Sequence, residues 1–149
     1  MATYVHLKKT EKGQSLVELA ISLLILLLVL AGVVDLGRLI FQYISIRDAA
    51  QEGAVYASIY PTACNQTIER VKSSIANTDP NQVTVTVLIN GLECGSATSH
   101  DACANKEARV TIQQPDYEIS MPFLGSALGK QSISISATMS STIIRPPCN

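Results

Sequence analysis

The sequence predicts an α+β fold in which a long N-terminal membrane-spanning helix extends into a small extracytoplasmic head with three or four antiparallel strands. Three observations carry this prediction. An uncharged apolar run joins Leu19 to Val34, no proline lies between Met1 and Pro61, and beyond Pro61 valine alternates with threonine and isoleucine with serine. A sheet this small needs an apolar cover on one face, and we expect the far half of the helix to supply it.

The composition narrows the class of protein. The chain has 149 residues, of which 47% are hydrophobic and 15% charged, against a usual charged share of about 25%. This length excludes a multidomain enzyme. The formal net charge of -1 leaves no positive excess for a phosphate backbone, so we expect no nucleic-acid partner. Because the chain has no tryptophan and two histidines, we expect no enzymatic activity, no cofactor and no small-molecule substrate.

The membrane segment is predicted at residues 14–36. The run from Leu19 to Val34 covers about 24 Å of helix, short of a bilayer core of about 30 Å. Extension back to Gln14 makes it long enough, but only if Glu18 lies in or beside the hydrocarbon. Lysines precede the run, which predicts a cytoplasmic N-terminus and an exported remainder. The alternative is a cleavable secretory signal ending near Ala31, although the apolar core is longer than the usual 7 to 15 residues.

The helix is predicted to continue outside the membrane over residues 37–60. Apolar residues recur at spacings of three and four through this stretch, as an amphipathic helix requires. Ala49, Gly53 and Ala57 recur every fourth residue and form a face with little side-chain bulk, which another element can approach closely. The alternative is that these alanines are simply good helix formers, although Gly53 lowers helix propensity.

Residues 61–149 are predicted to form the β-rich head. A short helix is expected over residues 67–75, and Asn90-Gly91 is expected to form a turn. The predicted strands are separated by a break at residues 114–116 and a glycine-bearing loop at residues 123–130. They cover residues 83–90, 108–113, 117–121 and 131–144.

The four cysteines predict disulfides. They contain no C-x-x-C pair, and neither His6 nor His100 completes a zinc pattern, so we expect no metal. An even number of cysteines in an exported head favours two disulfides, with three connectivities open. Among these we favour Cys94 with Cys103, which bracket a polar loop, and Cys64 with Cys148, which ties the chain end back to the helix.

The start of the apolar helix carries a processing motif. The segment Lys12–Glu18 reads K-G-Q-S-L-V-E and precedes the apolar run. It resembles a type IV prepilin processing site. The resemblance implies that prepilin peptidase, a membrane aspartyl enzyme, cuts between Gly13 and Gln14 on the cytoplasmic side. Residues 1–13 would then be a leader, and Glu18 the fifth residue of the mature chain. The alternative is that Ser15 and Glu18 form a capping box at a helix start.

Glu18 is the predicted assembly residue. A carboxylate within an apolar membrane segment is costly unless it is paired. When staggered helices pack together, the N-terminal ammonium of a neighbouring subunit is a natural partner. The neighbour would then have to be another processed chain.

A second resemblance covers roughly residues 13–60. Asp35-Leu-Gly-Arg38 after the apolar run, followed by A-A-x-x-G-A-x-Y-A at residues 49–57, resembles the TadE-like proteins of the tight-adherence (Tad, or Flp) pilus machinery. The resemblance implies a minor pilin or pseudopilin that acts in assembly of this type IVc pilus, with other pilins and the assembly platform as partners in the bacterial inner membrane. Major Flp pilins are far shorter and carry tyrosine after the glutamate, where this chain has Leu19.

Two questions stay open, namely the role of Asp35 and Arg38 and the class of protein. Asp35 and Arg38 form either a surface ion pair or an anchor at an interface between subunits. The competing class of protein is a signal-anchored extracytoplasmic binding or adhesion module unrelated to pili, and a weaker one is a secreted enzyme released by signal peptidase.

Overall fold

The computed structural model describes residues 12–76, 78–120 and 129–148. Two α-helices and a four-stranded sheet make up this part of the chain. The bounds are Lys12–Ile59 for α1, Cys64–Ser74 for α2, Thr84–Ile89 for β1, Leu92–Glu93 for β2, Glu107–Glu118 for β3 and Ser132–Thr142 for β4. Two short 3-10 turns, η1 (Pro80–Gln82) and η2 (Cys94–Ser96), follow α2 and β2.

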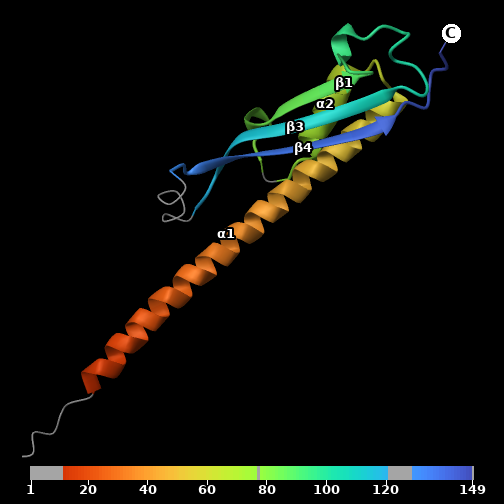
Figure 1. Ribbon diagram of the computed structural model, residues 1–149. Coiled ribbons are helices and arrows are strands. Elements are labelled where there is room, and N and C mark those ends of the chain that lie inside the picture. Colours follow the sequence, from red (N-terminus) through yellow and green to blue (C-terminus); the bar gives the residue numbers. More distant parts are fainter. Residues whose placement is uncertain (1–11, 77, 121–128, 149) are drawn as a thin grey trace, which may run out of the picture.

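Helix α1 is one unbroken element of 48 residues, about 72 Å long. Its N-terminal half projects away from the rest of the molecule, and its far half lies under the sheet (Figure 1). The projecting half is long and apolar enough to cross a membrane, and none of its apolar window is buried. It is the one candidate membrane-spanning helix within the described residues, near the N-terminus, as in a single-pass membrane protein.

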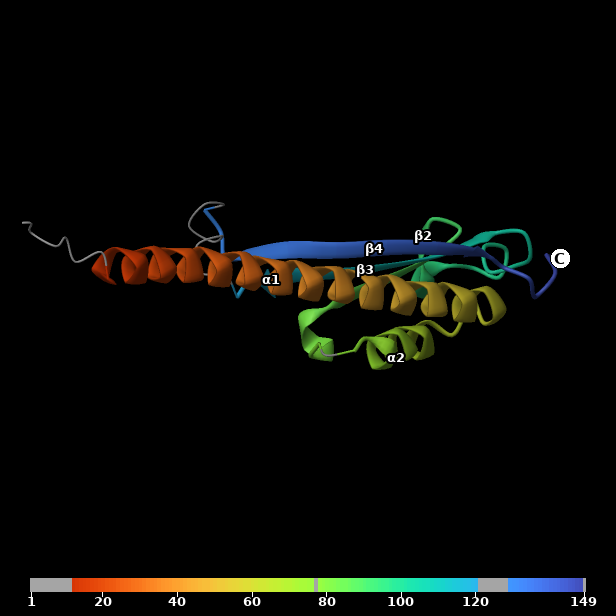
Figure 2. The ribbon, with the colours of Figure 1, turned by 90° about the horizontal axis from the view of Figure 1, so that it is seen from below.

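The sheet has the strand order β2-β1-β3-β4, and every neighbouring pair is antiparallel. Figure 2 shows β4 alongside one side of α1, with α2 on the other. The predicted α+β fold, a long helix with a small antiparallel sheet packed on its far half, is confirmed.

The core lies between α1 and the inner face of the sheet. Alternate residues of β3 and β4 point inward, whereas the outward residues of β4 are serines and threonines. Ile46 and the alanines at positions 49, 50, 54 and 57 are almost completely buried on the helix side. Because alanine has so little bulk, the helix backbone approaches the valines and isoleucines of the sheet closely.

Three details of the predicted elements are wrong. The break at residues 114–116 and the separate strand at 117–121 are replaced by one strand, because β3 continues to Glu118 through a register shift between Gln114 and Tyr117. Proline is tolerated in a strand at such an irregularity, so Pro115 does not end β3. Strand β2 was not predicted, and the second helix begins at Cys64, three residues before its predicted start. The leader to residue 11 and most of the predicted 123–130 loop lie outside the described residues.

Candidate functional site

The projecting half of α1 presents one carboxylate on an apolar surface. Glu18 is the only charged residue between Gly13 and Val34, and its side chain is exposed. Except for Leu28, which is partly buried, the large apolar residues of this segment are also more than half exposed. Within the described part of the chain, no cation forms an ion pair with Glu18. Because an apolar surface of this size is not stable against water, lipid or other helices must cover it.

The predicted cleavage point lies in the first turn of α1. The helix begins at Lys12, so Gly13 and Gln14 are exposed helical residues, and a Cβ added at Gly13 would meet no atom within 4 Å. Ser15 lies inside the helix and is therefore not its N-cap. The capping-box alternative for Ser15 and Glu18 is wrong for the chain as it stands here.

Asp35 and Arg38 do not form the ion pair that their spacing predicts, as judged from the described residues. The Arg38 Nη1 atom instead donates a hydrogen bond of 2.9 Å to Ser120 Oγ, just beyond β3. The Asp35 Oδ2 atom is buried and has no hydrogen-bond partner in the described chain. It lies at a mostly apolar cavity of about 210 Å³ whose other walls include Gly32 of α1 and Tyr117 of β3. The head therefore reaches back along α1 as far as Gly32.

The small-residue face is used inside the molecule. Ala49 and Ala57 are buried, and a Cβ at Gly53 would overlap Val71 of α2 and approach Val110 of β3. The structure therefore brings these three residues together against the head, and their face is closed to other chains.

The comparison with known families concerns this helix. Residues 13–55 match the family model of TadE-like proteins. No curated protein and no solved structure gives a significant match to the chain.

The resemblance to the TadE-like family predicted from the sequence is confirmed over this segment. The TadE-like segment contains Gly13, Gln14, Glu18, Asp35 and Arg38, while α2 and the whole sheet lie beyond it.

The predicted disulfide pairings are wrong. Cys64 is joined to Cys94, with Cα atoms 5.7 Å apart, and Cys103 to Cys148, with Cα atoms 5.0 Å apart. Cys64 opens α2 directly after the TadE-like helix, and the β1-β2 hairpin returns the chain to this point. Because β4 runs back beside β3, the chain end reaches the loop before β3, where Cys103 lies. None of the four cysteines is free.

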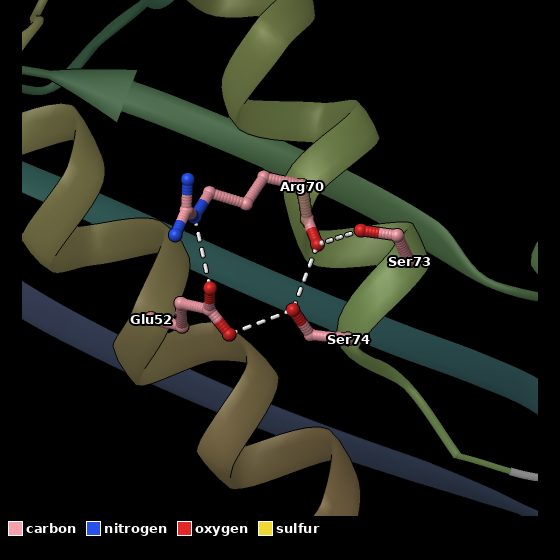
Figure 3. A network of polar contacts seen from close by, with 4 residues as sticks. All are labelled: Glu52, Arg70, Ser73 and Ser74. Atoms are coloured by element: carbon pink, nitrogen blue, oxygen red, sulfur yellow. Dashed lines mark hydrogen bonds and ion pairs between the residues drawn. The ribbon is translucent and has the colours of Figure 1, made fainter.

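A polar network that sequence reasoning missed fastens α2 to the TadE-like segment (Figure 3). Arg70 Nε of α2 donates a hydrogen bond of 2.8 Å to Glu52 Oε1 of α1, and Ser74 Oγ donates one of 2.7 Å to Glu52 Oε2. These bonds, that of Ser74 first, hold the pKa of Glu52 below its usual range. The Arg70 guanidinium also lies 5.2 Å from the centre of the Tyr56 ring, a cation-π contact.

A second polar contact is buried. Gln42 of the TadE-like segment is 5% exposed, and its Nε2 atom donates to Thr78 Oγ1 and, over 3.0 Å, to Gln114 Oε1 of β3. This contact lies beside the register shift in β3 and ties the sheet to one position along the helix axis.

Proposed function

We propose that this protein is a TadE-like minor pilin or pseudopilin that acts in assembly of a type IVc (Tad/Flp) pilus and catalyses no reaction. One observation carries the proposal. The segment that matches the TadE-like family is a continuous helix. Its first half is apolar apart from the lone carboxylate of Glu18, and no part of its most apolar window is buried within the described chain. Such a helix is suited to stand in a membrane and then pack among other helices.

The proposed location is the bacterial inner membrane, crossed once by residues 14–36. The lysines of the N-terminal segment favour a cytoplasmic N-terminus, which puts the head of residues 61–149 in the periplasm or at the cell surface. Tyr117 and Ile133 of the head line the same cavity as Gly32 and Asp35 at the end of this span, which supports a head that lies close to the membrane surface. Residues 37–60 then form the part of the helix that carries the head.

The proposed maturation is removal of residues 1–13 by prepilin peptidase. The Gly13–Gln14 bond lies in the first turn of α1, where helical hydrogen bonds are incomplete and the chain frays most easily. A local opening of this turn would present the bond in an extended form. Gln14 would become the N-terminal residue, with a free ammonium group.

The proposed role of Glu18 is to bind that ammonium group in a neighbouring subunit. The offset between residues 14 and 18 corresponds to an axial stagger of about 6 Å between parallel helices. In the low dielectric of a helix bundle, a charged pair is strongly favoured over one lone charge. Other pilins and the Tad assembly platform are the partners in this scheme.

Glu18→Gln tests the proposal in the native host. We expect the variant to be inserted, cleaved after Gly13 and folded with both disulfides, yet to yield no surface pili and no co-purified pilins. The reason is that glutamine leaves the ammonium without a counter-ion, a loss of up to several kcal/mol. Intact mass of the membrane protein reports cleavage, and electron microscopy reports piliation.

The controls separate assembly from simple anchoring. Glu69→Gln makes the same acid-to-amide change at an exposed position of α2, away from the apolar half of α1, and is expected to leave piliation unchanged. Normal piliation by Glu18→Gln, at matched expression, would remove the assembly role. A mature chain that begins near Gly32 would instead identify an ordinary secretory signal and favour an exported binding module unrelated to pili.

A further inference from the structure

The outer edge of β4 is a long strand edge without a neighbour. β4 pairs with β3 along one side, and no described strand pairs with its other side. It runs for 11 residues, whereas β2 at the opposite edge of the sheet has two. An open edge of this length presents a row of backbone donors and acceptors to any extended chain.

The backbone hydrogen bonds show which residues face outward. Ile143 N–H donates to Lys106 O, and Gln131 O accepts from Ile119 N–H, so odd-numbered residues of this strand direct their polar groups toward β3. Even-numbered residues alternate with them and direct N–H and C=O groups to the outer edge. Ile144, the next even position beyond β4, donates to Ser58 O at the end of α1. The even residues of β4, from Ser134 to Thr142, are all exposed.

The edge also lacks the usual protection against pairing. β4 contains no charged residue and no proline, and the irregularity in the β3-β4 ladder lies on β3. Natural proteins blunt open edges with lysine, proline or bulges, because an unprotected edge pairs with other strands. The outward side chains here are small hydroxyls, which leave room for another strand.

An exposed apolar strip of α1 lies beside this edge. It consists of Ile40, Tyr43 and Ile44, which are 49%, 46% and 46% exposed. Ser45 marks the side of α1 that faces α2, because its Oγ atom accepts a hydrogen bond from the Ala76 N–H just after that helix. At about 100° per residue, Ile40, Tyr43 and Ile44 lie roughly 100° to 160° around the helix axis from Ser45. They therefore face away from α2, toward the β4 side seen in Figure 2. Ile40 precedes Ser58 by about five full turns, so both lie on one line along the helix.

We propose that the outer edge of β4 binds an extended segment of a different polypeptide as a fifth strand of the sheet. Backbone groups of the even residues from Ser134 to Ser140 would pair with it, and its alternate apolar side chains would cover the strip at Ile40, Tyr43 and Ile44. Arg47 is exposed on the same flank and has no ion pair within the described chain, which disfavours a basic segment.

A second copy of this chain fits the edge less well. β4 runs in the same direction as α1 (Figure 1), so copies anchored in one membrane, as proposed above, present parallel β4 strands. Two parallel β4 strands can be joined edge to edge about a two-fold axis along the membrane normal. This axis turns the sheet of one copy over relative to the sheet of the other. The serine and threonine face of one copy would then cover the apolar strip of the other, so the strip would gain no apolar partner.

The test uses the full-length protein in detergent micelles and a fluorescent peptide of the sequence QTVTVTVTVQ, which has the required alternation, carries no charge and is not a segment of this chain. A peptide of the same composition in scrambled order is the control. Ser136→Pro removes an outward N–H that β3 does not use, and proline is tolerated at such edge positions. Ser136→Ala is the matched variant, because it removes the same hydroxyl and keeps the N–H.

We expect the alternating peptide to bind the parent and Ser136→Ala equally, and Ser136→Pro about tenfold or more weakly. Fluorescence anisotropy measures binding, and unchanged disulfide maps and circular dichroism verify the fold. Ile44→Lys should weaken binding similarly while Leu92→Lys, at the other edge, should not, which keeps the test valid if the proline variant misfolds. No binding to the parent, or equal binding to Ser136→Pro and Ile44→Lys, would overturn the proposal. Dimers of the parent that Ser136→Pro abolishes would show that the occupant is a second copy instead.

Discussion

Gly53 is a residue at which α1 approaches both α2 and β3 closely. A Cβ at this position would overlap Val71 Cγ2 and lie 3.4 Å from Val110 Cγ1. Both neighbours are fully buried valines, which cannot swing aside as a surface side chain would. The glycine therefore sets the distance at which the head packs on the helix.

Gly53→Ala is expected to destabilise the head by about 1–3 kcal/mol, because overpacking outweighs a gain in helix propensity of about 1 kcal/mol. Gly37→Ala is the matched control, since a Cβ there meets nothing within 4 Å and should leave the head's stability unchanged or slightly higher. Urea unfolding followed by circular dichroism in micelles compares the two. Equal midpoints for both variants would show that the contact at Gly53 is not limiting.

The close approach at Gly53 could be predicted from the sequence, whereas the polar contacts of Glu52 and Gln42 could not. A glycine spaced evenly among alanines indicates a close approach, since Gly53 is a poor helix former with no turn to make. The partners of Glu52 could not be predicted, because they depend on the path of α2 back along α1. Gln42 and Gln114 were hidden for the same reason: their contact joins residues far apart in the chain.

At the scale of elements, α2 is held to α1 by Val71 in the core and by the Glu52 network at the surface. Glu52 and Arg70 are 43% and 53% exposed, so solvent screens their ion pair, and its contribution is at most about 1 kcal/mol. The network therefore orients α2 more than it stabilises the fold.

This network predicts a specific pH dependence. The pKa of the Glu52 carboxyl is lower in the folded protein than in the unfolded chain, where it is about 4.3. The ionised carboxylate therefore stabilises the fold fully above the unfolded pKa, and this stabilisation is lost as the pH falls through the folded pKa. The stability difference between the parent and Glu52→Gln should be constant from about pH 7 to 5 and shrink toward zero in stronger acid. Thermal unfolding across this range measures it. Glu69→Gln, on α2 but outside the network, is the control, and an identical pH profile for both variants would contradict the assignment.

Strand prediction succeeded where alternation was undisturbed. The valine and threonine pattern of β1 and the isoleucine and serine pattern of β4 each place one side of a strand in the core, so their existence followed from local residues. β3 was divided in error at Pro115, because local rules treat proline as a break. The extra residue in β3 near Pro115 absorbs the irregularity, and the strand resumes its pairing at Tyr117.

At the scale of the whole molecule, two disulfides close the head at the end of α1 farthest from its apolar N-terminal half. Their connectivity could not be predicted, because spacing along the chain does not reveal that the β1-β2 hairpin returns to the start of α2. The chain end is likewise held through Cys103 and not through the helix junction.

Non-reducing peptide mapping is expected to recover Cys64 linked to Cys94 and Cys103 linked to Cys148. With sequence separations of 30 and 45 residues, the loop-entropy model gives stabilisations of about 3.6 and about 4 kcal/mol. Replacing either pair by serines should therefore lower the unfolding midpoint of the head clearly. A peptide that links Cys94 to Cys103 would contradict the structure.

The unbroken course of α1 has a mechanical consequence. Tension applied to the apolar N-terminal half would travel along the helix axis, in the same direction as β4 (Figure 1). The contacts of Ile46, Ala50, Ala54 and Ala57 with the sheet are then loaded together in shear and are not peeled apart one after another. At the far end, the Cys64–Cys94 bond passes the remaining load covalently from the helix end to the sheet. A pull along the helix axis is therefore resisted by the whole contact between helix and sheet at once.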